Sequence, residues 1–332
     1  MVKKIEISTK TIIFIAVFVA VIWFIFQIKD ILLGLFIALI LMSCINPAVR
    51  KLERYKFPRW LAILFIYIFA ILVIALSLGW LVPPLIEQTT IFINNIPAFF
   101  QQFKIFGIDE KLIASQFAQF SSIPVNLVKF LFDVFSNIAA IIALGVITFY
   151  LLLERKNLDH YLSLVLGVEK EKKIEIIINL IETRLGNWVR GELLLMMFVG
   201  TISYIGFLII GIDYALPLAL LAFLFEIIPS VGPTMAAIPA VIVGLTISPL
   251  HGLATAGWCF LVQQIENGIL VPRIMKKVAG VNPLVSLLSL AVGFKLAGIG
   301  GAILAIPSYI IVEVIFSVLY PNRFKQTDVG SS

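Results

Sequence analysis

Four ionisable side chains interrupt apolar stretches of this sequence, which otherwise keeps its charges in short clusters. They are Glu226, Glu266, Lys295 and Glu313. A charged side chain at the centre of a bilayer costs at least about 2.5–3.5 kcal/mol on insertion scales, so such residues often mark ion or substrate pathways. The alternative is that each lies near the end of a segment and reaches water. The four residues therefore indicate either a transport site or side chains at the membrane surface.

Two of these residues precede breaks rich in glycine and proline. Glu226 lies six residues before Gly232, and Lys295 lies five before Gly300. The stretches 232–239 and 300–307 both end in Ala-Ile-Pro, and each follows a Pro-Leu pair at a similar interval. Short apolar segments with Gly and Pro breaks at matching positions are typical of discontinuous helices in transporters. We predict an internal repeat, in which Glu226 and Lys295 form an ion pair if the two breaks meet.

The polar residues that end the 252–265 segment could line the same site. They form a wall for a substrate or ion, or they are simply a cytoplasmic helix end at which Glu266 pairs with Arg273. The glycines and prolines of the breaks could also serve helix packing alone. The predicted substrate- or ion-binding residues are Glu226, Pro229, Ser230, Gly232, Pro233, Gln263, Gln264, Glu266, Asn267, Lys295, Gly298, Gly300 and Gly301.

Motifs for catalysis, nucleotide binding and metal binding are missing from the sequence. It has no Gly-x-x-x-x-Gly-Lys-Ser/Thr loop, no His-Glu-x-x-His and no Gly-x-Ser-x-Gly turn. Its two histidines, His160 and His251, are far apart and have no cluster of Cys or acidic residues beside them. We expect no enzyme, no catalytic residue, no metal site and no cofactor. Cys44 and Cys259 lie in apolar runs and are expected to be free, buried thiols.

The composition predicts a membrane protein. Hydrophobic residues make up 61% of the 332 positions, whereas globular domains have about 45–50%. Only 13% are charged, which is too little to cover the core of a soluble protein. The net charge of +6 then reports the orientation of loops, and we expect membrane lipid rather than nucleic acid as the surroundings.

The elements that must position the site are apolar helices. About 20 apolar residues cross a bilayer, and the uncharged stretches predict full spans over 11–28, 31–46, 60–82, 134–153 and 193–212, with shorter segments over 214–228, 234–248, 252–265 and 284–319. The first two spans should form a tight hairpin. We predict an all-α polytopic membrane protein of about eight hydrophobic segments. Six are full transmembrane helices, the sixth crossing over 252–268, and two are inverted re-entrant hairpins, over 214–248 and 284–319. In the alternative, the short segments all cross fully.

Basic residues in the loops predict the topology. The loop 50–59 holds five Lys and Arg, segment 154–192 holds seven in 39 residues, and 83–133 holds three in 51. The positive-inside rule places both termini in the cytoplasm. The expected organisation is helices one to three in 1–82, an extracytoplasmic amphipathic and aromatic segment in 83–133, the fourth helix and a cytoplasmic amphipathic helical hairpin in 134–192, a transport core in 193–320 and a cytoplasmic tail in 321–332.

Several motifs together resemble the autoinducer-2 exporter (AI-2E) family of permeases. They are Glu-Ile-Ile-Pro-Ser-Val-Gly-Pro at 226–233, the stretch 264–275, Asn282-Pro283-Leu284, Gly-Ile-Gly-Gly at 298–301, Ala-Ile-Pro at 305–307 and Asn46-Pro47 before the basic loop. Ser230 stands where this family often has Tyr, and Asn282 where it often has His, which leaves the fine substrate contacts open.

The resemblance implies an inner-membrane, multi-pass permease without an ATPase. It implies a homo-oligomer, for which we consider a pentamer. We expect a secondary transporter that exports a small molecule such as autoinducer-2 with an ion gradient, and a proton-coupled mechanism would make Glu226 the carrier. The alternatives are a sodium or lithium/proton antiporter of the same family, a channel, or a membrane scaffold.

Overall fold

The computed structural model describes residues 9–77, 137–158, 168–229, 231–275 and 283–320, with positions 79, 83 and 87. Every regular element in these ranges is a helix, which confirms the all-helical prediction for this part of the chain. Four of the helices are long and apolar enough to cross a membrane: Lys29–Arg54, Arg59–Ser77, Lys172–Ile210 and Leu284–Leu319. Nearly all of the 83–133 segment, together with the 321–332 tail, lies outside the described residues.

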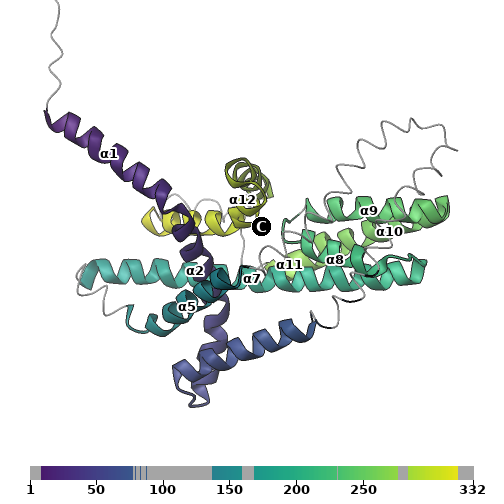
Figure 1. The fold of residues 1–332 in the computed structure, drawn as a ribbon, viewed down its shortest axis with the longest axis horizontal. Coiled ribbons are helices and arrows are strands. Elements are labelled where there is room, and N and C mark those ends of the chain that lie inside the picture. The colour runs from purple at the N-terminus through teal and green to yellow at the C-terminus, as the bar shows by residue number, and fades with distance from the viewer. Residues whose placement is uncertain are drawn as a thin grey trace, which may run out of the picture.

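The first two helices do not form the predicted tight hairpin. Helix α1 (Thr9–Gln27) runs into α2 (Lys29–Arg54), because the backbone hydrogen bonds continue across the junction, from Ile28 N to Phe24 O at 3.1 Å and from Leu32 N to Ile28 O at 2.9 Å. The predicted turn at Lys29-Asp30 contains no Gly or Pro to reverse the chain. Helix α1 therefore extends away from the rest of the protein (Figure 1).

Helix α7 (Val168–Ile210) is the long element against which the others pack. Its 43 residues join the second half of the predicted amphipathic hairpin to the predicted fifth span as one helix, so that half is not a separate surface element. It contributes Leu185 and Trp188, Val199, and Phe207 to three buried clusters. Gly186 allows α2 to approach it, because a Cβ at this position would lie 2.2 Å from the carbonyl oxygen of Ser43.

The last third of the chain forms short helices packed along α7 (Figure 1). They are α8 (Ala215–Phe225), α9 (Gly232–Ile247), α10 (Pro249–Ile265), the π-helix η2 (Glu266–Leu270) and α11 (Val271–Met275). Helix α5 (Ile138–Glu154) corresponds to the predicted span over 134–153, and α12 (Pro283–Leu319) corresponds to the predicted segment over 284–319. The first predicted break lies between α8 and α9.

The second predicted break lies inside α12. Ala297 and Gly298 have non-helical backbone angles, and Gly298 takes a φ of 61°. The chain doubles back there, since a Cβ on Gly301 would lie 2.0 Å from the carbonyl oxygen of Gly293, eight residues earlier. An unbroken helix would place these two residues about 12 Å apart. Both predicted breaks therefore interrupt helices.

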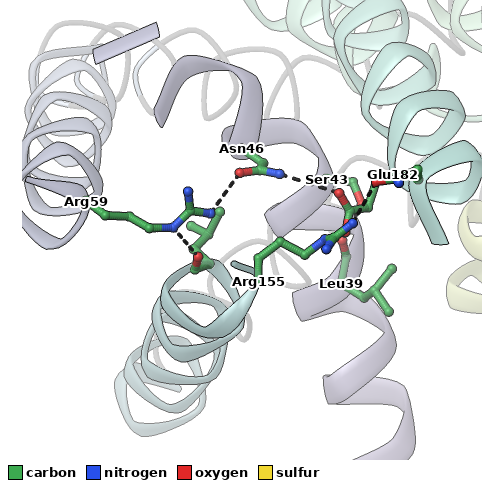
Figure 2. A network of polar contacts seen from close by, with 8 residues as sticks. Leu39, Ser43, Asn46, Arg59, Arg155 and Glu182 are labelled. Atoms are coloured by element: carbon green, nitrogen blue, oxygen red, sulfur yellow. Dashed lines mark hydrogen bonds and ion pairs between the residues drawn. The ribbon is translucent and has the colours of Figure 1, made fainter. Parts of the chain in front are cut away.

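A chain of polar contacts joins α2, α5, α7 and the helix Arg59–Ser77 (Figure 2). The Arg155 guanidinium forms a buried ion pair with Glu182, and Asn46 donates to the other Glu182 oxygen at 3.5 Å. Arg59 donates to Asn46 Oδ1 at 3.2 Å and to the carbonyl oxygen of Leu152 at 2.7 Å. We call these contacts the polar clamp. It fixes the N-terminal half of α7 against the first helices.

Replacing Arg155 by Met should destabilise the protein strongly. Glu182 would stay buried without its ion partner, and breaking such a pair costs about 3–5 kcal/mol. Denaturant unfolding in detergent micelles measures the free energy of unfolding. The double variant Arg155→Met/Glu182→Gln should regain most of the loss, and Lys156→Met, which removes an exposed neighbouring charge, should change the free energy by less than about 1 kcal/mol. An equal loss in Lys156→Met would contradict the assignment.

Candidate functional site

Four helices meet in a buried apolar layer. Val199 of α7, Ala222 of α8, Ala236 of α9 and Val262 of α10 form one cluster, and each is at most 6% exposed. Ala and Val allow close approach because their side chains are short. This layer holds the two helices beside the first break against α7 and α10.

Three glutamates lie one or two helical turns from this layer. Glu266 follows Val262 by four residues, Glu226 follows Ala222 by four, and Glu192 precedes Val199 by seven. Residues four or seven apart share one face of a helix. All three side chains are buried, with exposures of 3% for Glu192, 1% for Glu226 and 3% for Glu266. We call Glu192, Glu226 and Glu266 the acidic cluster.

The carboxyl groups of the acidic cluster interact with one another. The side chains of Glu226 and Glu266 lie within hydrogen-bonding reach of each other, and each also interacts electrostatically with Glu192. An ionised carboxylate only accepts hydrogen bonds, so a bond between two carboxyl groups requires a proton on one of them. Two carboxyl groups this close together in an apolar core favour a proton shared between them.

The remaining carboxyl oxygens of the acidic cluster have no hydrogen-bond partner within the described part of the chain. These are both oxygens of Glu192 and one each of Glu226 and Glu266. In the same ranges no Lys or Arg forms an ion pair with any of the three. No group of His, Cys, Asp and Glu there has the arrangement of a metal site. Buried and unpaired carboxylates are costly, which favours uptake of a proton or another cation.

Local structure at the first break positions Glu226. A Cβ on Gly232 would lie 1.8 Å from the carbonyl oxygen of Phe225, so only glycine lets α9 begin this close to Glu226. Pro233 occupies the first turn of α9, where its missing N–H costs nothing. On the facing helix, Gln263 Nε2 donates to Thr234 Oγ1 at 3.4 Å and joins α10 to the start of α9.

Glu266 begins the π-helix η2. A single π-helical turn within an α-helix is rare and is frequent at functional sites. It separates α10 from α11. The polar side chains of 263–267 differ in exposure: Glu266 is buried and Gln263 half-buried, whereas Gln264 and Asn267 are exposed. The predicted polar wall is thus divided, and only part of it faces the acidic cluster.

Neither predicted ion pair of the cluster is formed. Lys295 is exposed, and Glu226 lies beside Glu266 instead. Arg273 is also exposed, while Glu266 is buried. The chain just before the first break contacts α12, since Ile228 packs against the buried cluster of Leu290, Ala302 and Ala305. These α12 residues flank the second break, so the contact between the two regions is apolar and does not involve the exposed Lys295.

The other predicted residues are placed as follows. Pro229 and Pro233 are half-buried beside Glu226, and Gly298, Gly300 and Gly301 lie at the α12 turn. Ser230 lies outside the described residues. Glu313, the fourth ionisable residue, pairs with Arg184 at 2.8 Å and joins α12 to α7.

Sequence reasoning missed Glu192. Trp188, one helical turn before it, is only 7% exposed and packs in a core cluster with Leu185. The available signal was the spacing of Glu192, Leu195 and Val199, which places an acid on the buried face of a helix.

Adding a methyl group at Gly301 should destabilise the α12 hairpin. The Cβ would clash with the Gly293 carbonyl oxygen, whereas a Cβ on Gly300 meets nothing within 4 Å. Overpacking of this kind costs about 1–3 kcal/mol. Thermal unfolding in detergent should show a lower Tm for Gly301→Ala and an unchanged Tm for Gly300→Ala. Equal Tm values for the two variants would refute the reversal at Gly298.

The sequence that forms this site matches a known protein family. Residues 12–320 match the family described as "AI-2E family transporter". The relatives called "Putative transport protein" include YueF of Bacillus subtilis, 33% identical over 88% of this chain and 85% of its own length. YrrI of the same organism is 27% identical over 87% and 86%, and YhhT of Escherichia coli K12 is 25% identical over 84% and 82%.

The match covers the helices of the acidic cluster, both breaks and the polar clamp. With its apolar helices, it indicates a multi-pass membrane protein. The chain belongs to the AI-2E transporter family.

Proposed function

We propose that the protein is a secondary transporter that couples movement of a small molecule to a proton gradient. The observation that carries the proposal is the close approach of the buried carboxyl groups of Glu226 and Glu266, with Glu192 beside them. The family membership supports a transport function. Export of a small molecule such as autoinducer-2 is the direction and cargo class that we propose.

The acidic cluster would act as the coupling site. With a proton on the Glu226–Glu266 pair, less charge is buried and the closed packing of α7, α8, α9 and α10 is favoured. Loss of the proton adds negative charge to an apolar core, which favours entry of water or a cation. Protonation thereby shifts the balance between a closed and an open arrangement of the helices around it.

The two broken helices would form the moving parts. We propose that α8–α9 and the two halves of α12 are re-entrant hairpins of opposite orientation, and the packing of Ile228 against α12 supports their proximity. Non-helical backbone at membrane depth is tolerated where protein or water receives its polar groups. We further propose an inner-membrane location with cytoplasmic termini and a homo-oligomeric assembly.

A sodium or lithium/proton antiporter is the second candidate. The unpartnered oxygens of the acidic cluster favour it, because carboxylate oxygens are ligands that hard cations accept. A proton remains the first choice for the coupling ion, because a hydrogen bond between Glu226 and Glu266 requires one.

Glu226→Gln should abolish transport driven by a pH gradient and leave the fold intact. The amide can still hydrogen-bond to Glu266 but cannot release a proton. Purified protein in proteoliposomes, given a panel of small molecules and of Na⁺ and Li⁺, should transport with an imposed pH gradient. The Glu226→Gln flux should fall to the level of protein-free vesicles.

The matched control is Glu313→Gln, which changes a carboxyl outside the acidic cluster and should retain gradient-driven flux. Wild-type flux in Glu226→Gln would remove Glu226 from the mechanism. Unitary currents in planar bilayers would replace the carrier by a channel.

A further inference from the structure

The turn between α2 and the helix Arg59–Ser77 presents a concentrated positive charge. We call residues 50–60 the basic loop. Its side chains Arg50, Lys51, Arg54 and Lys56 are all exposed. Three aromatic side chains accompany them: Tyr55 is 78% exposed, Phe57 46% and Trp60 52%. These basic and aromatic residues lie at the end of α2, in the turn and at the start of the next helix, and together they suit a partner that is anionic and partly apolar.

Glu53, the acidic residue of the basic loop, is turned away from this surface. Glu53 accepts from Arg59 Nη1 at 3.0 Å and pairs with Lys156 Nζ at 2.8 Å, and its side chain is 17% exposed. Arg59 is also turned inward, where the polar clamp engages it (Figure 2). The outward charges of the basic loop are therefore all positive, and the clamp holds the loop in one position.

The tip of the basic loop has a lysine in a backbone conformation that favours glycine. Lys56 has a φ of 67°, in the left-handed region, at the position after a helix where glycine is the usual residue. The turn is closed by Phe57 N donating to Leu52 O at 3.4 Å and Lys56 N donating to Glu53 O at 2.9 Å. A lysine adopts this left-handed conformation less readily than glycine does, and it places a positive charge at the tip of the loop.

The location of the basic loop selects the partner. It joins two helices that are each long and apolar enough to cross a membrane, so it lies where the hydrocarbon region ends. Trp and Tyr are enriched at this level, and Lys and Arg there attract anionic lipids. We propose that the basic loop binds the headgroups of anionic phospholipids, with Lys51, Arg54 and Lys56 as phosphate contacts and the aromatic rings at the interface.

Competition between two lipids tests this proposal without measuring transport. The purified full-length protein is equilibrated with equimolar phosphatidylglycerol and phosphatidylcholine of identical acyl chains, and native mass spectrometry gives the ratio of bound lipids. Each basic residue near an anionic surface contributes about fivefold to binding. Lys56→Gly should lower the bound ratio about fivefold, and Lys51→Gln/Lys56→Gly about 25-fold.

Two comparisons keep the result interpretable. Glycine suits the turn at position 56, so Lys56→Gly should unfold at the wild-type Tm or above it. A lower ratio of bound phosphatidylglycerol to phosphatidylcholine in this variant is then caused by the lost charge and not by unfolding. The control Lys172→Gln/Lys173→Gln removes two exposed lysines from α7 and should keep the wild-type ratio.

Three results would overturn the proposal. They are a wild-type ratio in both variants of the basic loop, an equal loss in the α7 control, and displacement of phosphatidylglycerol by polyglutamate or an RNA oligonucleotide at equal charge. The last result would assign the basic loop to a soluble acidic partner.

Discussion

Carboxyl groups buried in an apolar core dominate the organisation of this protein. Glu192, Glu226 and Glu266 come from three separate elements, and each is nearly without solvent contact. In a medium of low polarity they cannot all be ionised without a compensating charge. The glycine that starts α9, the π-helical turn at Glu266 and the apolar layer below them all serve to bring these groups together. Their burial together favours uptake of a proton or a cation.

Helix α7 links this core to the rest of the molecule. Its first half is held by ion pairs, from Glu182 to Arg155 and from Arg184 to Glu313, and by the buried cluster around Leu185 and Trp188. Its second half is held by apolar contacts around Val199 and Phe207. Glu192 lies at the boundary between these two halves. A change of charge at Glu192 therefore acts between the part of α7 that carries these two ion pairs and the part that packs around Val199 and Phe207.

Local features of the chain were predictable, because they depend on neighbouring residues alone. The breaks at 229–233 and 297–301 follow from Gly and Pro, which interrupt helices wherever they occur together. The predicted hairpin between the first two spans is wrong because a charged pair such as Lys29-Asp30 need not end a helix. The predicted pairing of Glu226 with Lys295 is wrong because similar positions in a repeat do not determine where side chains point.

The class of protein, most of the apolar helices, the two breaks and the family can be recognised from the sequence, since they follow from apolar length, Gly and Pro placement and motif spacing. The fold was needed to show that Glu192 joins Glu226 and Glu266, that Lys295 does not, and that the acid of the basic loop is turned inward. These outcomes depend on which helix faces meet. A meeting of faces is set by packing among residues far apart in sequence, such as Val199, Ala222 and Val262.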